Sequence, residues 1–336
     1  MNELLTVKNL KVKYDLHQSW FKELFSKEKS YVKAVDGVDF TIHKGEILTL
    51  VGESGSGKTT TGKAILQLLD NVEGDIEFNG TSLPTKEKKV LKGFRQDAQM
   101  IYQDPYQSLN PKDRVFDIVA EPLVVNKMAR SEQEKEEKVK TALESSGLKP
   151  AEKYLAKYPH ELSGGQRQRV AIAAALILNP KLIIADEPVS MLDMSVRSDI
   201  LRVLIQLRDH KDISYLFITH DLSLAWLISD RIAIMYLGKI VEVGSYDKIM
   251  NASLHPYTKA LINVMPRLEV KKKREKRLTL TGETPDPSNV PSGCRFHPRC
   301  PFAQEKCKQS EPSIRDFGDG HHVACHFVEE LKEEVS

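Results

Sequence analysis

The sequence has little of what a membrane-spanning or exported chain needs. Its longest uninterrupted apolar run covers residues 170–178, far short of the roughly 20 residues that cross a bilayer. The N-terminus carries charges at short intervals and has no apolar signal core. Cysteine is scarce too, and all four cysteines lie near the C-terminal end. Without an export signal, clustered thiols favour metal ligands over disulfides.

The sequence also lacks a large excess of charge of either sign. The 336 residues include 49 Lys and Arg against 47 Asp and Glu, a formal net charge of +2. The bulk charge therefore gives no indication of a nucleic-acid partner. The content of 40% hydrophobic and 29% charged residues is ordinary for a globular chain. This length suits one large α/β domain with a smaller appendix.

Strand and helix patterns alternate along most of the chain. Residues 4–14 and 35–51 carry the β-branched, partly alternating patterns of strands. Residues 90–160 are charge-rich and helical in character. Strands that alternate with helices predict a mainly parallel sheet with helices packed on it.

A glycine-rich loop follows the apolar strand 47–51 and precedes an apolar helix. Its sequence, GESGSGKT, fits G-x-x-x-x-G-K-[ST]. The glycines let backbone N–H groups surround a phosphate, Lys58 reaches the β- and γ-phosphates, and the Thr59 hydroxyl ligates Mg²⁺. The predicted phosphate-binding residues are Gly52, Ser54, Gly55, Ser56, Gly57, Lys58, Thr59 and Thr60. Kinases, GTPases and transport motors share this loop, so other motifs must decide.

Two adjacent acids end the apolar run 182–185. Asp186 suits Mg²⁺. Because successive side chains of a strand point to opposite faces, Glu187 can point toward the γ-phosphate and activate an attacking water. A solvated strand end is the alternative for such a pair, and the phosphate loop favours the catalytic interpretation.

The segment LSGGQ, residues 162–166, resembles the signature motif of the ABC ATPases. Further motifs of that family follow its order along about residues 1–250. They are Tyr14 as the adenine-stacking aromatic, Gln103 of the Q-loop, residues 190–193 (SMLD) as the D-loop and His220 as the switch histidine. Met191 stands where the family more often has alanine.

The resemblance implies a catalytic set of Glu187, His220 and Gln103, with Thr59, Gln103 and Asp186 around Mg²⁺. It also implies that Ser163, Gly165 and Gln166 complete the ATP site of a partner cassette. The implied fold is an α/β P-loop cassette with a mainly parallel core, an antiparallel β subdomain and a helical subdomain at about residues 95–175. No internal repeat is found, so we expect one cassette, residues 1–250.

Residues 102–111, 158–161 and 255–261 resemble the oligopeptide and dipeptide permease ATPases, whose F-type subunit the whole chain is similar to. This implies a C-terminal extension over residues 251–336 and a place at the cytoplasmic face of the membrane. The implied partners are a second, related ATPase, two permease chains and an extracytoplasmic solute-binding protein, with no nucleic acid. Nickel and glutathione importers have close relatives, so the solute stays open.

The cysteines follow the spacing Cys294-x5-Cys300-x6-Cys307-x17-Cys325. Four thiolates suit either an iron–sulfur cluster or zinc, and the absence of C-x₂₋₄-C pairs disfavours zinc. The family resemblance implies a [4Fe–4S] cluster. The expected role is structural, because a small, weakly apolar appendix gains folding energy from a metal.

Two segments and one competing class stay open. The aromatic insertion with Trp20, Phe21 and Phe25 faces either the permease and lipid or the cassette itself. The basic run 271–277 is either a lipid contact or a solvated linker. A soluble ABC ATPase acting on ribosomes or DNA is the runner-up, although such chains usually hold two cassettes. An exporter motor is disfavoured by the C-terminal extension.

Overall fold

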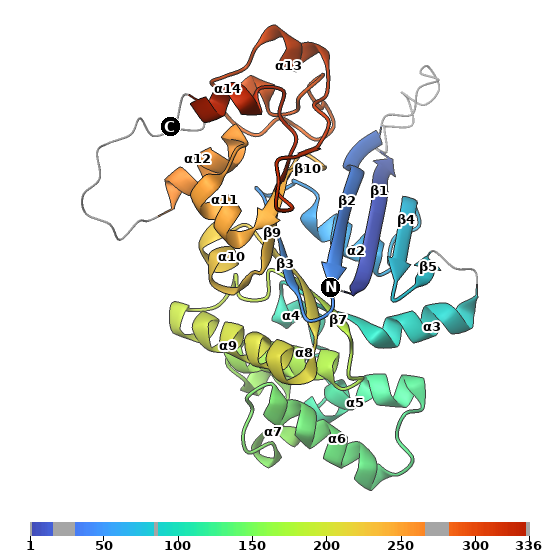
Figure 1. Cartoon of the computed structure of the whole chain (residues 1–336). Helices are drawn as coiled ribbons and strands as arrows, with labels where there is room; N and C mark the ends of the chain where they lie inside the picture. Colours follow the sequence, from blue (N-terminus) through green and yellow to red (C-terminus); the bar gives the residue numbers. More distant parts are fainter. Residues whose placement is uncertain (1, 16–30, 84–86, 266–281, 334–336) are drawn as a thin grey trace, which may run out of the picture. The chain divides into compact units, whose positions relative to one another are not determined.

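The computed structural model describes residues 2–15, 31–83, 87–265 and 282–333 (Figure 1). The aromatic insertion at residues 20–25 and the basic run 271–277 lie outside these residues, and so their interpretations stay predictions. The chain divides into two compact units. The first unit comprises residues 1–4, 42–47 and 84–218, and the second comprises residues 5–41, 48–83 and 219–336.

The first unit contains a parallel sheet. Strands β6 (Ala98–Ile101), β7 (Leu182–Asp186) and β8 (Ser214–Thr219) pair in that order, with Met100 opposite Ile184 and Ile184 opposite Leu216. Both β7 and β8 are buried along their whole length. This continuous burial is typical of parallel strands covered on both faces.

Helices supply the rest of the first unit. Within the described residues they are α3 (Lys88–Asp97), α4 (Pro105–Ser108), α5 (Val115–Asn126), α6 (Glu132–Ser145), α7 (Glu152–Leu155), the 3₁₀ turn η1 (Pro159–Glu161), α8 (Gly164–Leu176) and α9 (Met194–Lys211). Helices α5, α6 and α8 share an apolar cluster in which Val119, Leu143 and Val170 are fully buried. Each such side chain contributes about 1.5–3 kcal/mol through burial, so this cluster holds the helical layer together.

The second unit has an antiparallel sheet in the order β2 (Tyr31–His43), β1 (Glu3–Asp15), β4 (Val72–Phe78) and β5 (Thr81–Leu83). The pairing of β1 with β4 shifts register between Lys8 and Lys11. Gly74 faces this bulge with φ +108°, and a Cβ there would lie 2.5 Å from the carbonyl oxygen of Asn9. Only glycine fits this position, since it accepts a positive φ and leaves room for the opposite backbone.

The other strands of this unit belong to the eight-stranded sheet and carry the phosphate loop and part of the C-terminal extension. Strand β3 (Ile47–Val51) pairs in parallel with β9 (Arg231–Tyr236), which forms a hairpin with β10 (Lys239–Ser245). Beyond β10 lie β12 (His322–Val323) and β11 (Arg315–Asp316). Strands β12 and β11 of the extension therefore extend this sheet beyond β10.

The helices of the second unit are α2 (Lys58–Ile65), α10 (Leu222–Ile228), α11 (Tyr246–Ala252), α12 (Pro256–Val264), the turn η2 (His297–Arg299), α13 (Glu305–Gln309) and α14 (Val328–Glu333). Figure 1 shows α10, α11 and α12 close to the β9–β10 hairpin. None of the helices in the described part of the chain combines the length and apolar character needed to cross a bilayer. The predicted α/β class is confirmed. The strand pattern at residues 35–51 divides into β2 and β3, and the helical stretch 90–160 also contains β6. The boundary at residue 250 and the subdomain limits stay predictions.

Candidate functional site

The glycine-rich loop connects β3 to α2, as its motif predicts. Lys58 is buried, and its ammonium group donates to the carbonyl oxygens of Gly52 (2.8 Å) and Glu53 (2.9 Å). The loop thus curls around its own lysine. Ser54 and Gly55 are exposed, while Thr59 and Thr60 lie half-buried in the first turn of α2.

Two glycines of the loop are required by their surroundings. Gly57 has φ +104°, and a Cβ there would lie 2.2 Å from the carbonyl oxygen of Ala34. A Cβ on Gly52 would lie 2.2 Å from the carbonyl oxygen of Met235. The loop also accepts a hydrogen bond at the carbonyl of Ser56 from the Gly238 N–H (2.8 Å). Backbone from β2 and the β9–β10 hairpin therefore supports the predicted phosphate site.

The acidic pair stands at the end of β7 in the first unit. Asp186 is the last residue of the strand and is buried, and Glu187 follows with φ +45°. The Glu187 N–H donates to the Ile218 carbonyl (2.9 Å). The amide of Gln103 donates to the Glu187 carboxylate (3.1 Å). The structure thus brings together two residues that the sequence assigned to one catalytic set.

An arginine that carried no sequence signal organises the D-loop. Arg197, on α9, donates to the carbonyl oxygens of Leu192 (2.7 Å) and Ser190 (3.1 Å). Ser190 in turn donates to the Glu187 carbonyl through its N–H (3.2 Å) and its hydroxyl (3.1 Å). A chain of hydrogen bonds therefore runs from α9 through the D-loop to the acidic pair.

The signature segment begins helix α8. The Ser163 hydroxyl accepts from the Gln166 N–H (3.3 Å), and the Gln166 side chain accepts from the Ser163 N–H (3.1 Å). This reciprocal capping box satisfies two otherwise unpaired donors of the first turn. A Cβ on Gly165 would lie 2.5 Å from Cγ1 of Val196 on α9, so the signature helix and α9 pack closely here.

The remaining predicted residues are more exposed. His220 follows β8 and is exposed, and Tyr14 near the end of β1 is 42% exposed. The motifs divide between the two units. Tyr14, the phosphate loop and His220 belong to the second unit, and Gln103, Ser163, Asp186 and Glu187 belong to the first.

All four cysteines are free thiols, and all four line one cavity in the second unit together with Phe296, Phe302 and Phe327. Burial raises the pKa of the Cys294 thiol to about 11 and that of Cys300 to about 12. Neighbouring cysteines add to the shift. No set of three or more His, Cys, Asp or Glu side chains among the described residues has metal-site geometry. The predicted cluster therefore stays a prediction, although its four ligands face a common space.

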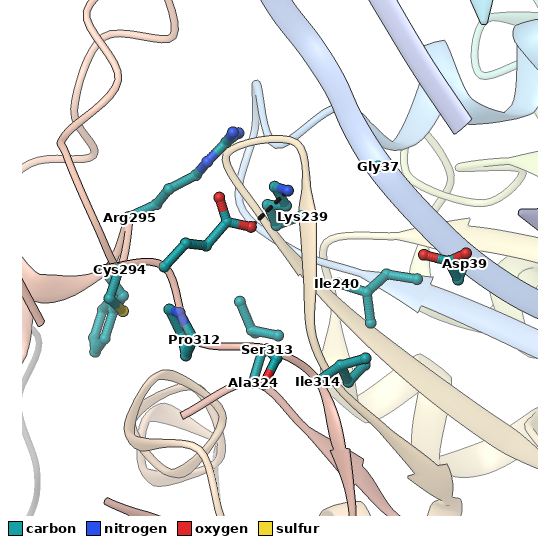
Figure 2. A pocket seen from close by; sticks show the side chains of 13 residues that line it. Gly37, Asp39, Lys239, Ile240, Cys294, Arg295, Pro312, Ser313, Ile314 and Ala324 are labelled. Atoms are coloured by element: carbon teal, nitrogen blue, oxygen red, sulfur yellow. Dashed lines mark ion pairs between the residues drawn. The ribbon is translucent and has the colours of Figure 1, made fainter. Parts of the chain in front are cut away.

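A separate pocket lies where the extension meets the β9–β10 hairpin, and Lys239 pairs with Glu311 across it (2.6 Å; Figure 2). Arg295 also lines it and bonds to the Leu237 carbonyl and to Asp36. Although burial alone would raise the pKa of Asp36, Arg295 and neighbouring lysines hold it below its ordinary value. None of the predicted nucleotide-binding residues lines this pocket.

Both the cassette and the C-terminal extension of this chain are similar in sequence to known proteins. Residues 35–190 match the ABC transporter family, and residues 241–307 match the C-terminal region of the oligopeptide/dipeptide transporters. The oligopeptide transport ATP-binding protein AppF of Bacillus subtilis is 45% identical over 90% of this chain and 92% of that relative. OppF of Salmonella typhimurium, also an oligopeptide transport ATP-binding protein, is 43% identical, with coverage of 98% and 97%. The dipeptide transport ATP-binding protein DppF of Escherichia coli is 42% identical, with coverage of 92% and 91%.

Solved structures agree with these relatives. The dimeric structure of MJ0796, a bacterial ABC transporter cassette, matches with a TM-score of 0.63 at 27% identity and covers 72% of this chain and 99% of that chain. A post-hydrolysis dimer of the same cassette, bound to ADP and Pi, gives a TM-score of 0.62 over the same shares at 27% identity.

The fold and the ordered motifs define an ATP-binding cassette of the ABC transporter class, an ATPase with an α/β fold, as predicted. Within that class the chain belongs to the family of oligopeptide and dipeptide transport ATP-binding proteins. The predicted family and the role as ATP-binding subunit are thereby confirmed. The relatives do not test the roles of single residues, the cysteine module or the second ATPase.

Proposed function

We propose that this chain energises the uptake of oligopeptides or dipeptides by hydrolysing ATP at the cytoplasmic face of the membrane. The observation that carries the proposal is the match of residues 241–307 to the oligopeptide/dipeptide transporter C-terminal region. That segment includes most of β10 and all of α12, which pack in the same apolar cluster as Val51 of β3. The family-specific segment is thus integral to the unit that holds the phosphate loop.

We infer the following division of labour at the ATP site. The amides of the loop and Lys58 bind the phosphates, since backbone N–H groups and an ammonium complement their charge. Thr59, Asp186 and Gln103 are the groups suited to Mg²⁺, which neutralises charge on the phosphates. Glu187 accepts the proton of the attacking water, and its hydrogen bond from Gln103 (3.1 Å) orients it. His220 contacts the γ-phosphate, and Tyr14 stacks on adenine.

The signature residues Ser163, Gly165 and Gln166 act on the ATP of a partner cassette. Two observations support this assignment: Ser163 is exposed at the start of a 13-residue helix, and the related cassette MJ0796 forms dimers. We propose a related second ATPase as the partner, together with two permease chains and a solute-binding protein. The names of the relatives support the transport assembly, since they are oligopeptide and dipeptide transport proteins.

Genetic complementation tests the transport function. In a strain lacking this chain, uptake of a labelled di- or tripeptide should fall to background, and the wild-type chain should restore it. The Glu187→Gln variant should bind ATP but hydrolyse it about 10²–10⁴-fold more slowly, and it should not restore uptake. Lost uptake of nickel or glutathione with normal peptide uptake would reassign the solute, and recovery of the chain with ribosomes or DNA instead of permeases would overturn the proposal.

We further propose that Cys294, Cys300, Cys307 and Cys325 hold a [4Fe–4S] cluster. The shared cavity supports this, because four cysteines that line one space can act together as thiolate ligands. The cluster would tie the extension together and contribute folding energy. Metal analysis of anaerobically purified protein tests it: about four irons per chain and a charge-transfer band at about 400 nm support the cluster, whereas zinc or no metal contradicts it.

A further inference from the structure

Two arginines of the extension reach residues near the phosphate loop. Each is a direct neighbour of a cysteine: Arg295 follows Cys294 and Arg299 precedes Cys300. Arg295 bonds to the β9–β10 turn and to β2. Arg299 bonds to Glu53, the second residue of the phosphate loop.

The contact between Arg299 and Glu53 is a two-pronged ion pair. Two nitrogens of the guanidinium donate to the two carboxylate oxygens, at 2.9 and 3.3 Å. Arg299 is 7% exposed, and the side chain of Glu53 is 26% exposed. The hydroxyl of Thr284 also donates to the carboxylate and accepts from Arg299 (3.2 Å). Paired geometry of this kind is the strongest form of charge-assisted hydrogen bond in proteins.

The backbone of Glu53 is held from the same side. Its N–H donates to the Tyr257 hydroxyl (3.2 Å), and Tyr257 lies on α12 in contact with Tyr236 and Phe296, at ring-centroid distances of 4.8 and 5.3 Å. Both the side chain and the backbone of Glu53 are therefore held by residues from the C-terminal third of the chain. The cassette motifs need none of these residues.

We propose that Arg299 is a positioning residue for ATP binding: acting through Glu53, it holds the phosphate loop in its binding conformation and couples it to the cysteine cavity. The proposal rests on the assigned role of the phosphate loop. The coupling runs in both directions, since any group that changes ATP affinity must in turn be affected by bound ATP.

The sign of the effect follows from charge. Without Arg299, the Glu53 carboxylate has no cationic partner in a loop that must bind the negatively charged phosphates of ATP. The loop also loses the two hydrogen bonds that Arg299 donates to it. Both consequences weaken ATP binding. The Glu53→Gln change removes the carboxylate and therefore eliminates the first consequence. In the Glu53→Gln background Arg299 has no charged partner in the loop, so its removal should have little further effect on ATP binding.

A double-mutant cycle on the full-length chain tests this coupling, with the Kd of a fluorescent ATP analogue as the readout. Arg299→Met should raise the Kd about tenfold, within the usual range of coupling between sites, and Arg299→Lys should fall between. In the Glu53→Gln background the same Arg299→Met change should alter the Kd less than about twofold. An equal loss in both backgrounds would overturn the proposal, because Arg299 would then act only through the stability of the extension.

Arg315→Met is the matched control. Arg315 forms a similar two-pronged pair with Glu329 (3.0 and 3.1 Å) and donates to the Cys325 carbonyl, so it also stabilises the cysteine region. Its removal should leave the Kd unchanged. The Lys58→Ala variant distinguishes failure of the proposed phosphate loop from failure of the positioning role. If Lys58→Ala binds the analogue as tightly as the wild type, the loop does not bind ATP as assigned. If Lys58→Ala loses binding but the double-mutant cycle shows no coupling, only the positioning role of Arg299 is wrong.

The reverse direction supplies a readout independent of turnover. Saturating Mg²⁺–ATP should slow hydrogen–deuterium exchange of the backbone amides of residues 294–300, measured by mass spectrometry on the protein as purified. The protection should be lost in Arg299→Met and kept in Arg315→Met. Equal exchange rates with and without ATP in the wild type would contradict the coupling.

Discussion

His255 should make the stability of this protein depend on pH. The residue is buried and precedes α12, where its Nδ1 accepts a hydrogen bond from the Tyr257 N–H (3.1 Å). Burial lowers the pKa of His255 to about 4, and the nearby carboxylate of Glu242 opposes this only in part. In the unfolded chain the pKa of histidine is about 6.5. Between these two values the unfolded chain binds the extra proton and the folded chain does not.

Stability must therefore fall as the pH falls through this window. Linkage between pKa values of about 6.5 and about 4 gives a loss of about 2 kcal/mol from pH 8 to pH 5, and about 3 kcal/mol by pH 4. Above pH 7 the contribution is constant, since both states are neutral. The loss is a substantial part of a typical unfolding free energy of about 5–15 kcal/mol.

His255→Asn isolates this contribution. Asparagine accepts the same kind of capping bond but does not titrate. Denaturant unfolding of both proteins, followed by circular dichroism at matched ionic strength, should show the wild type losing about 2 kcal/mol more than the variant between pH 8 and pH 5. Parallel pH profiles would refute the reasoning, because the variant changes the titrating group and keeps the cap.

Three further predictions follow from close contacts. Gly57→Ala should abolish ATP binding and lower the melting temperature, because its Cβ would meet the Ala34 carbonyl at 2.2 Å with φ at +104°; calorimetry and nucleotide titration check both. Arg197→Met should slow ATP hydrolysis more than it weakens ATP binding, since it frees the D-loop carbonyls of Ser190 and Leu192; phosphate-release assays at saturating ATP decide this. Glu242→Gln should cost about 1–3 kcal/mol in unfolding experiments, as the buried carboxylate accepts from Leu254 N–H (2.7 Å), His255 N–H (3.1 Å) and His321 (2.8 Å).

Local spacing made the phosphate loop and the signature segment predictable. In GESGSGKT the glycines, the lysine and the threonine must stand at fixed intervals, because one turn of backbone has to surround a phosphate. The LSGGQ segment likewise contains its own cap, since Ser163 and Gln166 are three residues apart. The strand pattern at residues 35–51 covers most of β2 and all of β3, which shows that a pattern identifies strands better than it identifies their ends.

Long-range partners had no such signal. Glu53 and Arg299 are 246 residues apart, and no periodicity connects a residue of the loop to an arginine beside a cysteine. Arg197 was missed for a related reason: a single arginine in the first turns of a helix belongs to no motif, and only the fold reveals that it binds two D-loop carbonyls. Contacts of this kind depend on the tertiary fold, which local sequence patterns do not encode.

The segment HPYTKAL, which the sequence tied to the peptide-importer family by resemblance alone, has a physical role in the structure. His255 caps α12, Pro256 occupies its first position, where a missing N–H costs nothing, and the Tyr257 hydroxyl receives the Glu53 N–H of the phosphate loop. Glu242 on β10 binds both the start of this segment and His321 of the extension. A buried carboxylate is costly unless several donors surround it, so β10, α12 and the extension stabilise one another. The family-specific segment is therefore connected to the phosphate loop by the hydrogen bond from the Glu53 N–H to Tyr257.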